Sequence, residues 1–593
     1  MHKNMTNLEI AELLRGVAAA YELQDEVKNK FRIIAYQRAA DAIEHLSSEA
    51  KDLWDEGKLE DVAGIGTSIA QHLGEIFKEG FSRHFKNIMG NLPPAMFELM
   101  KVPGIGPKTA YKLSKNLNIR KADGALESLQ ASIDEGKVSG IEGFGEQSQE
   151  AIRKAIKEAG SKERRMLLPY ATQIANEIIN WLTKDKGIKR ADSLGSLRRK
   201  ASTIGDIDIS VATDSPKEAI ERFTEYPKAK RILEKGERTA MILLPGDIHV
   251  DLLVQNPDSY GSALQHFTGS KHHNVALREY AQKRNLSLSE YGIKVIKGGN
   301  RTLKKFSNEE DFYKYLNMEW IPPELREDTG EIEAARKNIL PQLVELNDIK
   351  ADLQIHSDFD IETSHDLGLS TMEEIILKAQ SLGYEYMAFT EHNPSQRGHS
   401  NKDIIDILKR KREIVDKINY SHKNIRGIYV FNSLEIDILP DGTLPVSDQG
   451  LKLLDFALVS IHSSFRQSKI DATKRVLSAL SFPKVKIFAH PTGRKLVQRE
   501  GVEIDWEKVF EFCVKNNKYL EINADPMRLD LPDFLVKEAV EHGVMLTLGT
   551  DAHHTDAMDN MEFGVSVARR GWATKENIIN TRSLQEFNKL ILK

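Results

Sequence analysis

The chain contains a single cysteine, Cys513, among its 593 residues. One thiol excludes an intrachain disulfide and a thiolate metal site, and it fits a reducing compartment. No run of about 20 apolar residues occurs, and the first residues lack the apolar core of a signal peptide. We therefore expect a cytoplasmic protein that neither spans a membrane nor is secreted.

The chain also lacks an overall positive charge, because its formal net charge is −5. This does not exclude nucleic acid as a partner, since a local basic groove is enough to bind it. The length leaves room for several domains, and 29% charged with 40% hydrophobic residues is typical of a globular chain. Histidine is enriched after residue 350, which indicates metal ligands in that part.

A glycine-rich turn recurs in the first part of the chain, where apolar spacing predicts short helices. Two good copies are Val62-Ala-Gly-Ile-Gly66 and Val102-Pro-Gly-Ile-Gly106, and a looser third is Ile141-Glu-Gly-Phe-Gly145. Glycines let the backbone approach a phosphate, and the helix that follows offers free N–H groups. One such turn is more often a plain helix–helix loop, but the repetition favours helix-hairpin-helix modules that bind the DNA backbone. The expected DNA contacts are Gly64, Gly66, Gly104, Gly106 and Lys108.

Residues 161–318 change to a mixture of strands and helices, with strands predicted around Ile207-Asp-Ile-Ser-Val and His249-Val-Asp-Leu-Leu-Val. Asp206 and Asp208 are two residues apart, so a strand places both side chains on one face. Two adjacent carboxylates repel each other unless a cation lies between them, which suits Mg²⁺ carrying a nucleoside triphosphate. Asp251 on the second strand would complete the set and add a second metal.

A lone Asp-x-Asp is a solvated strand end about as often as a site, but here Gly195-Ser-Leu-Arg-Arg199 precedes it. Gly195 and Ser196 would offer a helix N-terminus to the phosphates, and Arg199 would neutralise developing charge. Together, Gly195-Ser-Leu-Arg-Arg199 and Gly205-Asp-Ile-Asp208 resemble the nucleotidyltransferase signature of family X DNA polymerases.

Further segments match that family in order: His266-Phe-Thr-Gly-Ser270, His273-Asn274, Leu277-Arg278 and Glu290-Tyr-Gly292. The resemblance runs from about residue 5 to 318 and implies several contacts. Phe267 and Gly269 would pack on the incoming sugar and Asn274 would contact the nucleotide, while Arg278 and Tyr291 would contact DNA. Catalysis and metal binding would belong to Asp206, Asp208 and Asp251, with Mg²⁺ or Mn²⁺.

Two departures from the family bear on activity. The position of the lyase lysine is His72, with Ser68 one turn earlier. Lyase chemistry needs a primary amine, so we predict weak or absent lyase activity, although Arg32 and Tyr36 could serve a 5′-phosphate pocket. The family's Tyr-Phe pair is replaced by His266-Phe267, which leaves the exclusion of ribonucleotides open.

Residues 319–347 begin with a proline pair and an acidic run, and we predict an interdomain linker with a short helix. From residue 348 short apolar strands alternate with helices, which is compatible with an α/β barrel. Histidines and carboxylates fall at the strand ends, which converge on one mouth in a barrel. Such a mixed cluster suits Mn²⁺, Zn²⁺ or Fe²⁺, two or three per site, and could generate hydroxide for attack on a phosphodiester.

Residues 348–590 resemble the PHP domain that follows family X polymerases in many prokaryotes. The likeness is carried by Glu435-Ile-Asp-Ile-Leu-Pro-Asp-Gly442, His490-Pro-Thr-Gly-Arg494 and Glu521-Ile-Asn-Ala. It implies 3′–5′ exonuclease activity, often with processing of blocked 3′ ends. The metal ligands that it implies are His356, His392, Glu435, His462, His490, Asp551 and His553.

The PHP pattern is altered at three places. Gln354 stands where the family has the first histidine, and Thr390-Glu-His392 replaces Thr-Asp-His. A longer stretch replaces Ser-Asp-Gly, so Asp358, Asp360 and Asp366 are all candidate ligands, and we favour Asp366. Loss of the first histidine removes one ligand from one metal.

We therefore expect a multidomain fold in five parts: all-α helix-hairpin-helix regions at 1–90 and 91–160, an α+β nucleotidyltransferase palm at 161–318, the linker, and a distorted TIM-like PHP barrel at 348–593. The expected function is a monomeric gap-filling DNA polymerase of base excision repair, acting on gapped or primer–template DNA and dNTPs, with a 3′–5′ exonuclease. One alternative is the same polymerase with an inert PHP domain used for docking. Another, a nucleotidyltransferase for RNA or small molecules, is disfavoured by the hairpin modules.

Overall fold

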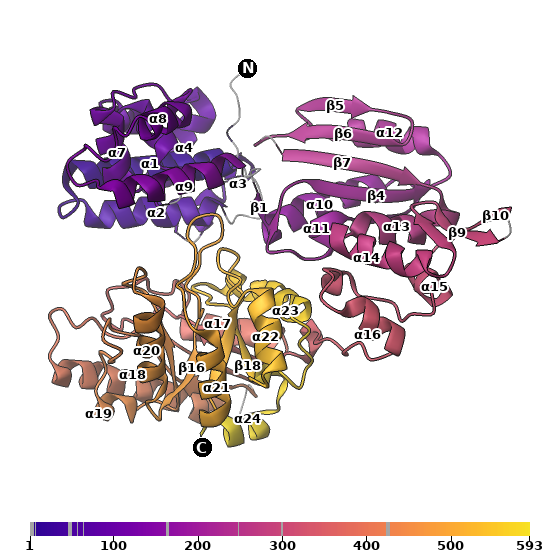
Figure 1. Cartoon of the computed structure of the whole chain (residues 1–593). Helices are drawn as coiled ribbons and strands as arrows, with labels where there is room; N and C mark the ends of the chain where they lie inside the picture. The colour runs from indigo at the N-terminus through magenta and orange to yellow at the C-terminus, as the bar shows by residue number, and fades with distance from the viewer. Residues whose placement is uncertain are drawn as a thin grey trace.

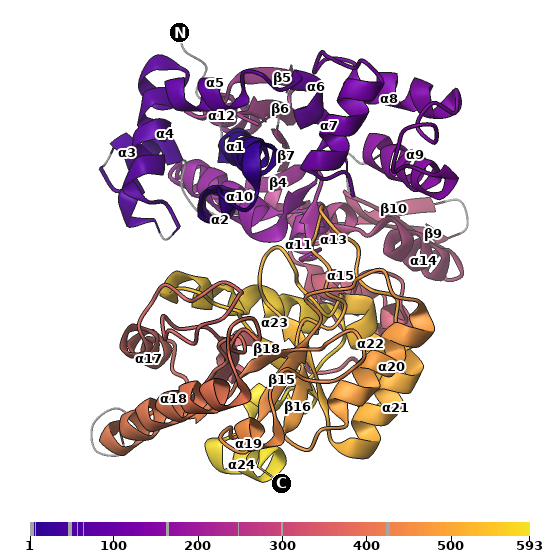
Figure 2. The ribbon, with the colours of Figure 1, turned by 90° about the vertical axis from the view of Figure 1, so that its left-hand side faces the viewer.

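The computed structural model describes residues 5, 7–44, 50–55, 57–62, 64–102, 104–161, 165–246, 248–297, 300–422 and 427–592. Ala63 and Pro103, inside the two predicted hairpin turns, lie outside the described residues. The helical N-terminal region and a five-stranded sheet lie on the same side of the C-terminal domain (Figure 1 and Figure 2). In the described part of the chain, no helix combines the length and apolar character that a membrane span requires.

The N-terminal region is all helical, as the apolar spacing predicts. Its helices are α1 (Asn7–Asp25), α2 (Lys30–Glu44), α3 (Ala50–Asp55), α4 (Thr67–Glu79), α5 (Arg83–Met89), α6 (Pro94–Leu99), α7 (Pro107–Asn116), α8 (Ala125–Asp134) and α9 (Glu146–Ser161), with the 3₁₀ helix η1 (Leu59–Asp61). Two separate apolar cores form, one around Leu14 and Leu73 and one around Met96 and Leu129. Helices α4 and α7 each begin directly after a predicted glycine turn, which places their N-termini at the turns.

The next region is built on a sheet with strand order β2-β4-β7-β6-β5. Only β4 and β7 pair in parallel. The alternating residues Ile207, Ile209, Val250 and Leu252 are fully buried, so Asp208 and Asp251 lie on the opposite face. The elements are β1 (Met166–Leu167), α10 (Leu168–Thr183), β2 (Ile188–Ser193), α11 (Gly195–Arg198), β3 (Thr203–Ile204), β4 (Ile207–Thr213), α12 (Pro216–Thr224), β5 (Arg231–Lys235), β6 (Thr239–Leu244) and β7 (Ile248–Gln255).

A helical and antiparallel region follows the sheet and continues into the expected linker. Its elements are η2 (Pro257–Ser259), α13 (Tyr260–Thr268), α14 (Lys271–Gln282), β8 (Leu286–Ser289), β9 (Gly292–Lys297), β10 (Asn300–Lys304), α15 (Glu309–Tyr315), η3 (Pro323–Leu325), α16 (Glu331–Lys337) and η4 (Leu346–Asp348). Residues 319–347 contain a short helix, α16, and they are well packed. Ile321, Leu325 and Ala335 share one core with Phe312, while Val344 joins the core of the C-terminal domain.

The C-terminal domain contains eight parallel strands in two sheets, β11-β12-β13 and β14-β15-β16-β17-β18. Single bridges join the sheets, His392 with Glu435 on one side and Ile355 with Ala552 on the other. The strand residues are almost all buried, which explains why they form short apolar runs in the sequence.

The bounds in this domain are β11 (Ala351–Ile355), α17 (Met372–Ser381), β12 (Tyr386–Phe389), α18 (Asn401–His422), β13 (Tyr429–Asn432), β14 (Glu435–Asp437), α19 (Asp448–Leu451), β15 (Ala457–Ser460), α20 (Lys469–Leu480), β16 (Val485–Phe488), α21 (Trp506–Asn516), β17 (Tyr519–Asn523), α22 (Asp533–Glu541), β18 (Leu546–Gly549), η5 (Thr555–Asn560), α23 (Met561–Arg570), η6 (Ile579–Thr581) and α24 (Leu584–Ile591). Cys513 lies on α21 and is buried, and burial raises the pKa of its thiol to about 12. The sole thiol is therefore a core group.

Candidate polymerase and nuclease sites

Three carboxylates gather at one edge of the five-stranded sheet. Asp208 on β4 and Asp251 on β7 are direct partners in the parallel register, and Asp206 immediately precedes β4. Burial, followed by the negative charges of Asp251 and Asp206, raises the pKa of Asp208 to about 6. Burial and the charge of Asp206 likewise raise the pKa of Asp251 to about 6. Such a cluster is stabilised by a cation, and carboxylates are the ligands that Mg²⁺ prefers.

The short helix α11 starts against this cluster. Gly195 has a φ of +55°, and a Cβ atom at this position would lie 2.7 Å from Oδ2 of Asp208. The backbone N–H of Leu194 donates to the carbonyl oxygen of Asp208 at 2.8 Å. Only glycine therefore lets the N-terminus of α11 lie this close to the carboxylates, and Ser196 follows it directly.

Arg199, just after α11, lies beside the Phe267–Ser270 turn. Its Nη1 donates to the carbonyl oxygen of Thr268 at 2.5 Å, and its Nε donates to Glu327 Oε1 at 2.9 Å. A Cβ atom on Gly269 would lie 3.1 Å from the same Nη1. The structure thus brings Arg199 together with Gly269 next to the half-buried Phe267.

Asn274 fixes the end of α13. Its Nδ2 donates to the carbonyl oxygen of His266 at 2.7 Å, and its Oδ1 accepts from Gln265 Nε2 at 2.9 Å. Arg278 is exposed on α14, and Tyr291 is 56% exposed. Both side chains are therefore accessible to a macromolecular ligand.

The predicted hairpin glycines lie on the N-terminal helical region. Gly64 and Gly104 have positive φ angles of 95° and 85°, while Gly66 and Gly106 precede α4 and α7 with open space around them. Lys108 is exposed and pairs with Glu26 at 2.6 Å. These features leave the helix N-termini accessible to an anion.

His72, at the position of the family's lyase lysine, stacks on His84 with ring centroids 4.4 Å apart. The hydroxyl of Tyr21 lies 2.8 Å from Nε2 of His84, and the guanidinium of Arg32 lies 5.5 Å from the Tyr21 ring. Tyr36 is buried against the same group. Two imidazoles therefore lie where the family has its lyase lysine. Low lyase activity stays a prediction.

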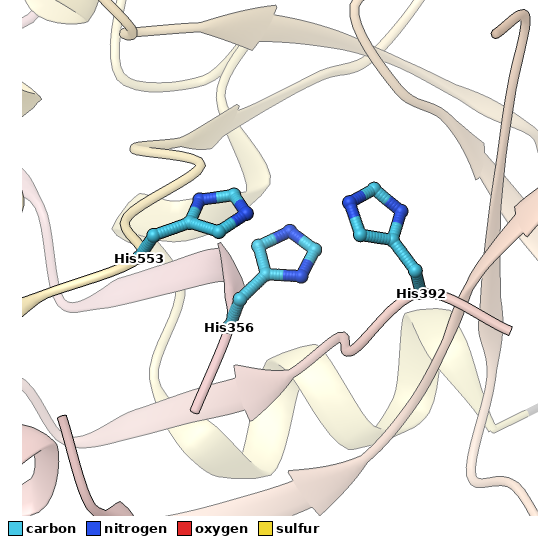
Figure 3. Close-up of side chains that lie close together, drawn as sticks. All are labelled: His356, His392 and His553. Atoms are coloured by element: carbon cyan, nitrogen blue, oxygen red, sulfur yellow. The ribbon is translucent and has the colours of Figure 1, made fainter. Parts of the chain in front are cut away.

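The C-terminal domain gathers histidines and carboxylates at the ends of its strands. Figure 3 shows His356 between His392 and His553, and the centroid of its ring lies 4.6 Å and 4.3 Å from theirs. Four overlapping groups keep their possible ligand atoms within 4.8 Å of one another: His356, His392 and His553; His365, His392 and His462; Glu435, His462 and His490; His356, Glu435 and Asp551. All seven ligands implied by the PHP resemblance belong to these groups.

Glu435 is the centre of the cluster. Its Oε1 lies 2.7 Å from Nε2 of His490 and 3.2 Å from Nε2 of His462, while its Oε2 lies 3.4 Å from Nε2 of His356. Burial alone would raise the pKa of Glu435, but the surrounding imidazoles hold it well below its usual range. A carboxylate in this position can bridge two metal ions.

The backbone and the ring nitrogens of the cluster also fit ligation. His490 and Asp551 have positive φ angles of 28° and 56°, an uncommon conformation for residues other than glycine. Among the described residues, buried Nδ1 atoms of His392 and His490 have no hydrogen-bond partner. Buried polar atoms without partners are rare, so these nitrogens fit metal coordination.

The sequence interpretation missed His365 and Asp437. Nε2 of His365 lies 2.8 Å from Oδ2 of Asp437, and Nδ1 of His462 lies 2.7 Å from Oδ1 of the same carboxylate. Asp437 therefore orients two rings of the cluster. Its position two residues after Glu435, on the same face of β14, was the available signal.

The favoured Asp366 lies outside the four groups. Its carboxylate accepts from Nη2 and Nε of Arg38 on α2, at 2.6 Å and 3.1 Å. Asp358 and Asp360 are exposed, and Asp360 accepts from the backbone of Glu362. Which of the three aspartates binds metal thus stays a prediction.

Gln354 places an amide inside the cluster. Its Nε2 donates to Oε2 of Glu435 at 3.0 Å and lies 3.5 Å from Oδ1 of Asp551, while its Oε1 accepts from Asn523 at 3.3 Å. Nε of Arg528 lies 3.5 Å from Oδ2 of Asp551. Hydrogen-bond donors therefore satisfy carboxylates that a metal ion would otherwise neutralise.

Comparison with known proteins gives the family of the chain. A DNA polymerase/3'-5' exonuclease PolX of Bacillus subtilis (strain 168) is 36% identical over 588 residues, which cover 99% of this chain and 98% of the relative. The chain belongs to the family X DNA polymerases. Family models match as a helix-hairpin-helix domain at 5–81, a SAM-like helix-hairpin-helix tandem at 97–158 and a DNA polymerase beta thumb at 263–327. The family X chain thus has the expected multidomain layout, and its thumb extends past residue 318 into the segment predicted as a linker.

Two more distant relatives match parts of the chain. DNA polymerase lambda of Rattus norvegicus is 24% identical over 352 residues, or 54% of this chain and 56% of the relative. A probable phosphatase of Caldicellulosiruptor bescii is 26% identical over 227 residues, or 37% of this chain and 87% of the relative.

Proposed function

We propose that the chain fills short gaps in DNA during base excision repair and trims 3′ ends at a second, separate site. Family membership gives the enzyme class, a DNA-directed DNA polymerase joined to a 3′–5′ exonuclease. The observation that supports the first site most directly is the alignment of Asp208 with Asp251, with Gly195 packed on the Asp208 carboxylate.

At the polymerase site, Asp206, Asp208 and Asp251 would hold Mg²⁺ or Mn²⁺. The metal supplies charge neutralisation for phosphoryl transfer when it is bound. Gly195 and Ser196 present the N-terminus of α11 to the triphosphate. Arg199 adds a guanidinium that matches phosphate oxygens.

The remaining contacts position the two substrates. Phe267 and Gly269 would pack on the sugar of the nucleotide, and Asn274 would contact it while holding the turn in place. Arg278 and Tyr291 would contact the DNA. The hairpin turns with Gly64, Gly66, Gly104, Gly106 and Lys108 would bind its backbone, so that affinity falls with salt.

We assign the exonuclease to a PHP barrel formed by the C-terminal strands. His356, His392, Glu435, His462, His490, Asp551 and His553 would hold two or three ions of Mn²⁺, Zn²⁺ or Fe²⁺, with Asp366 or His365 as a further ligand. When bound, such ions would supply hydroxide and hold a phosphodiester for attack. Glu435 holds the central position and Asp437 fixes the ring orientations of His365 and His462.

One observation favours a second candidate, the same polymerase with an inert PHP domain. Gln354 donates hydrogen bonds where the family has a metal-binding histidine, which weakens the position between His356, Glu435 and Asp551. Two of the four groups, His356–His392–His553 and His365–His392–His462, contain neither of the carboxylates that Gln354 contacts. We therefore favour an active nuclease.

A paired assay on one labelled duplex with a one-nucleotide gap, in Mn²⁺, tests both sites. Asp206→Ala/Asp208→Ala should abolish extension and leave 3′ degradation, and His490→Ala should do the reverse. His542→Ala is a matched control, because this exposed histidine bonds the Glu538 carbonyl oxygen and belongs to none of the four ligand groups found among the described residues. Loss of both activities in either variant would contradict separate sites. Extension without any degradation by the unmodified chain would favour the inert domain.

A further inference from the structure

An arginine of the C-terminal domain reaches the polymerase region. Arg570 ends α23, and its Nη1 donates to the backbone carbonyl oxygen of Arg199 at 2.7 Å. Its Nε donates to Oδ2 of Asp533, at the start of α22, at 2.7 Å. The Arg570 side chain is only 9% exposed. A residue anchored in the C-terminal domain thus binds the backbone of the segment proposed to hold the triphosphate.

Glu327 links the same two arginines through their side chains. Its Oε1 accepts from Nη1 of Arg570 at 3.0 Å and from Nε of Arg199 at 2.9 Å. Arg199 is therefore held at its carbonyl by Arg570, at Nε by Glu327 and at Nη1 by the Thr268 carbonyl oxygen. The chain Asp533–Arg570–Glu327–Arg199 connects the C-terminal domain to the Phe267–Ser270 turn without a gap.

Sharing one carboxylate oxygen changes how strongly Glu327 holds Arg199. The positive charge of Arg570 at the same oxygen repels the Arg199 guanidinium and offsets part of its attraction to Glu327, so the net pull on Arg199 is weaker than that of a carboxylate with one cationic partner. If Arg570 were removed, the charge of Glu327 would act on Arg199 alone, and the Arg199 carbonyl would lose its donor. The Arg199 guanidinium would then be less available to a phosphate.

We propose that Arg570 is a positioning residue for nucleotide binding, through which the docked C-terminal domain sets Arg199 for the incoming triphosphate. This proposal rests on the nucleotide-binding role proposed above for Arg199. Arg570 touches no reacting group, and it acts through Glu327 and the Arg199 backbone.

The neighbouring Arg569 provides a matched control. Its Nε pairs with Glu324 Oε1 at 2.8 Å, and its Nη1 donates to the Val344 carbonyl oxygen at 3.1 Å. It therefore stabilises the same interface from the same helix, and within the described part of the chain its side chain bonds neither Arg199 nor Glu327. Arg569→Ala weakens docking while it leaves the shared carboxylate intact.

Single-nucleotide gap filling with Mg²⁺ in the full chain gives KM for the dNTP and kcat separately. We expect Arg570→Ala to raise KM about tenfold, as for the loss of one charge-assisted hydrogen bond, with kcat changed much less. Arg570→Lys keeps the positive charge but not the planar guanidinium that bonds Glu327 and the Arg199 carbonyl oxygen together, and it should give an intermediate KM. Arg569→Ala should leave KM within about twofold of the unmodified chain, because its half-buried pair with Glu324 does not involve Arg199 or Glu327.

Neutralising Glu327 distinguishes an effect of Arg570 on the position of Arg199 from a general loss of protein stability. In the Arg570→Ala background, Glu327→Gln should return KM toward the original value, because Arg199 is no longer held by an undivided negative charge. The exonuclease rate of each variant reports that the C-terminal domain is folded. If Arg570→Ala itself fails to fold, Arg570→Lys with and without Glu327→Gln carries the same comparison.

Equal KM changes for Arg569→Ala and Arg570→Ala, or no rescue by Glu327→Gln, would overturn the proposal. Arg199→Ala separates a failure of the nucleotide-binding role of Arg199 from a failure of the positioning role of Arg570. An unchanged KM in that variant would reject the nucleotide-binding role of Arg199 itself. A raised KM in Arg199→Ala with a normal KM in Arg570→Ala would reject only the positioning role.

Discussion

Replacing Gly195 by alanine places a methyl group between α11 and the carboxylates proposed to be catalytic. The new Cβ would lie 2.7 Å from Oδ2 of Asp208, whereas ordinary contact begins at 3.4 Å. The carboxylate or the helix start must therefore move by about 0.7 Å, the difference between these two distances. Because a misplacement of about 1 Å can reduce an enzyme rate about 10²-fold, we expect kcat/KM for gap filling to fall by roughly that factor.

Alanine at this position also has to adopt a φ of +55°, which costs about 1–2 kcal/mol in the left-handed region. Gly383→Ala isolates this cost, since Gly383 has a φ of +79° and no atom within 4 Å of an added Cβ. Steady-state gap filling of both variants, with 3′ degradation on the same preparations, is the assay. Gly383→Ala should keep both activities. Near-normal gap filling by Gly195→Ala would refute the close approach of α11 to Asp208.

Three further outcomes are expected. Because burial and neighbouring carboxylates raise the pKa of Asp208 to about 6, this carboxyl binds more protons in the metal-free folded chain than in the unfolded chain between about pH 4 and 6, and its contribution to stability falls as pH rises through that window. Asp208→Asn should therefore stabilise the metal-free protein at pH 7 by roughly 1–2 kcal/mol. The gain in melting temperature from this substitution should be larger at pH 7 than at pH 5. An equal gain at both pH values would show that the pKa of Asp208 is not raised. Gln354→His should add one bound metal equivalent by elemental analysis of dialysed protein, and an unchanged stoichiometry would show that Gln354 does not limit the site. Glu435→Gln should reduce 3′ degradation at least about 10²-fold while gap filling persists, since the carboxylate at the centre of the proposed metal cluster is lost.

The sequence predicts which carboxylates lie together where their spacing follows strand geometry. The i and i+2 spacing of Asp206 and Asp208 places them at one edge of β4, and the structure aligns Asp208 with Asp251 as direct partners. In the C-terminal domain, the predicted ligands follow short buried strands whose ends meet. Both results depend on local periodicity, which the sequence displays directly.

Other features depend on contacts between distant segments, which local periodicity does not reveal. His365 lies in an irregular stretch without a strand period, so only tertiary packing brings it to His392 and His462. The charges of residues 319–347 favoured a linker, yet Arg326 and Glu331 are fully buried. Arg326 pairs with Glu309 at 2.6 Å, and Glu331 pairs with His273 at 2.6 Å. Pairing allows these charges to be buried, and composition does not show which partners a charge will find.

The buried position of Cys513 makes the natural chain a convenient background for site-specific labelling. A thiol with a pKa near 12 is almost entirely protonated at neutral pH, and reagents in solution do not reach a core side chain. Cysteines introduced on the exposed faces of α2 and α17 would therefore carry a pair of fluorophores without removal of the native residue. The distance between the fluorophores would report whether the Arg38–Asp366 contact persists in solution. It would also show whether gapped DNA separates the N-terminal helices from the C-terminal domain.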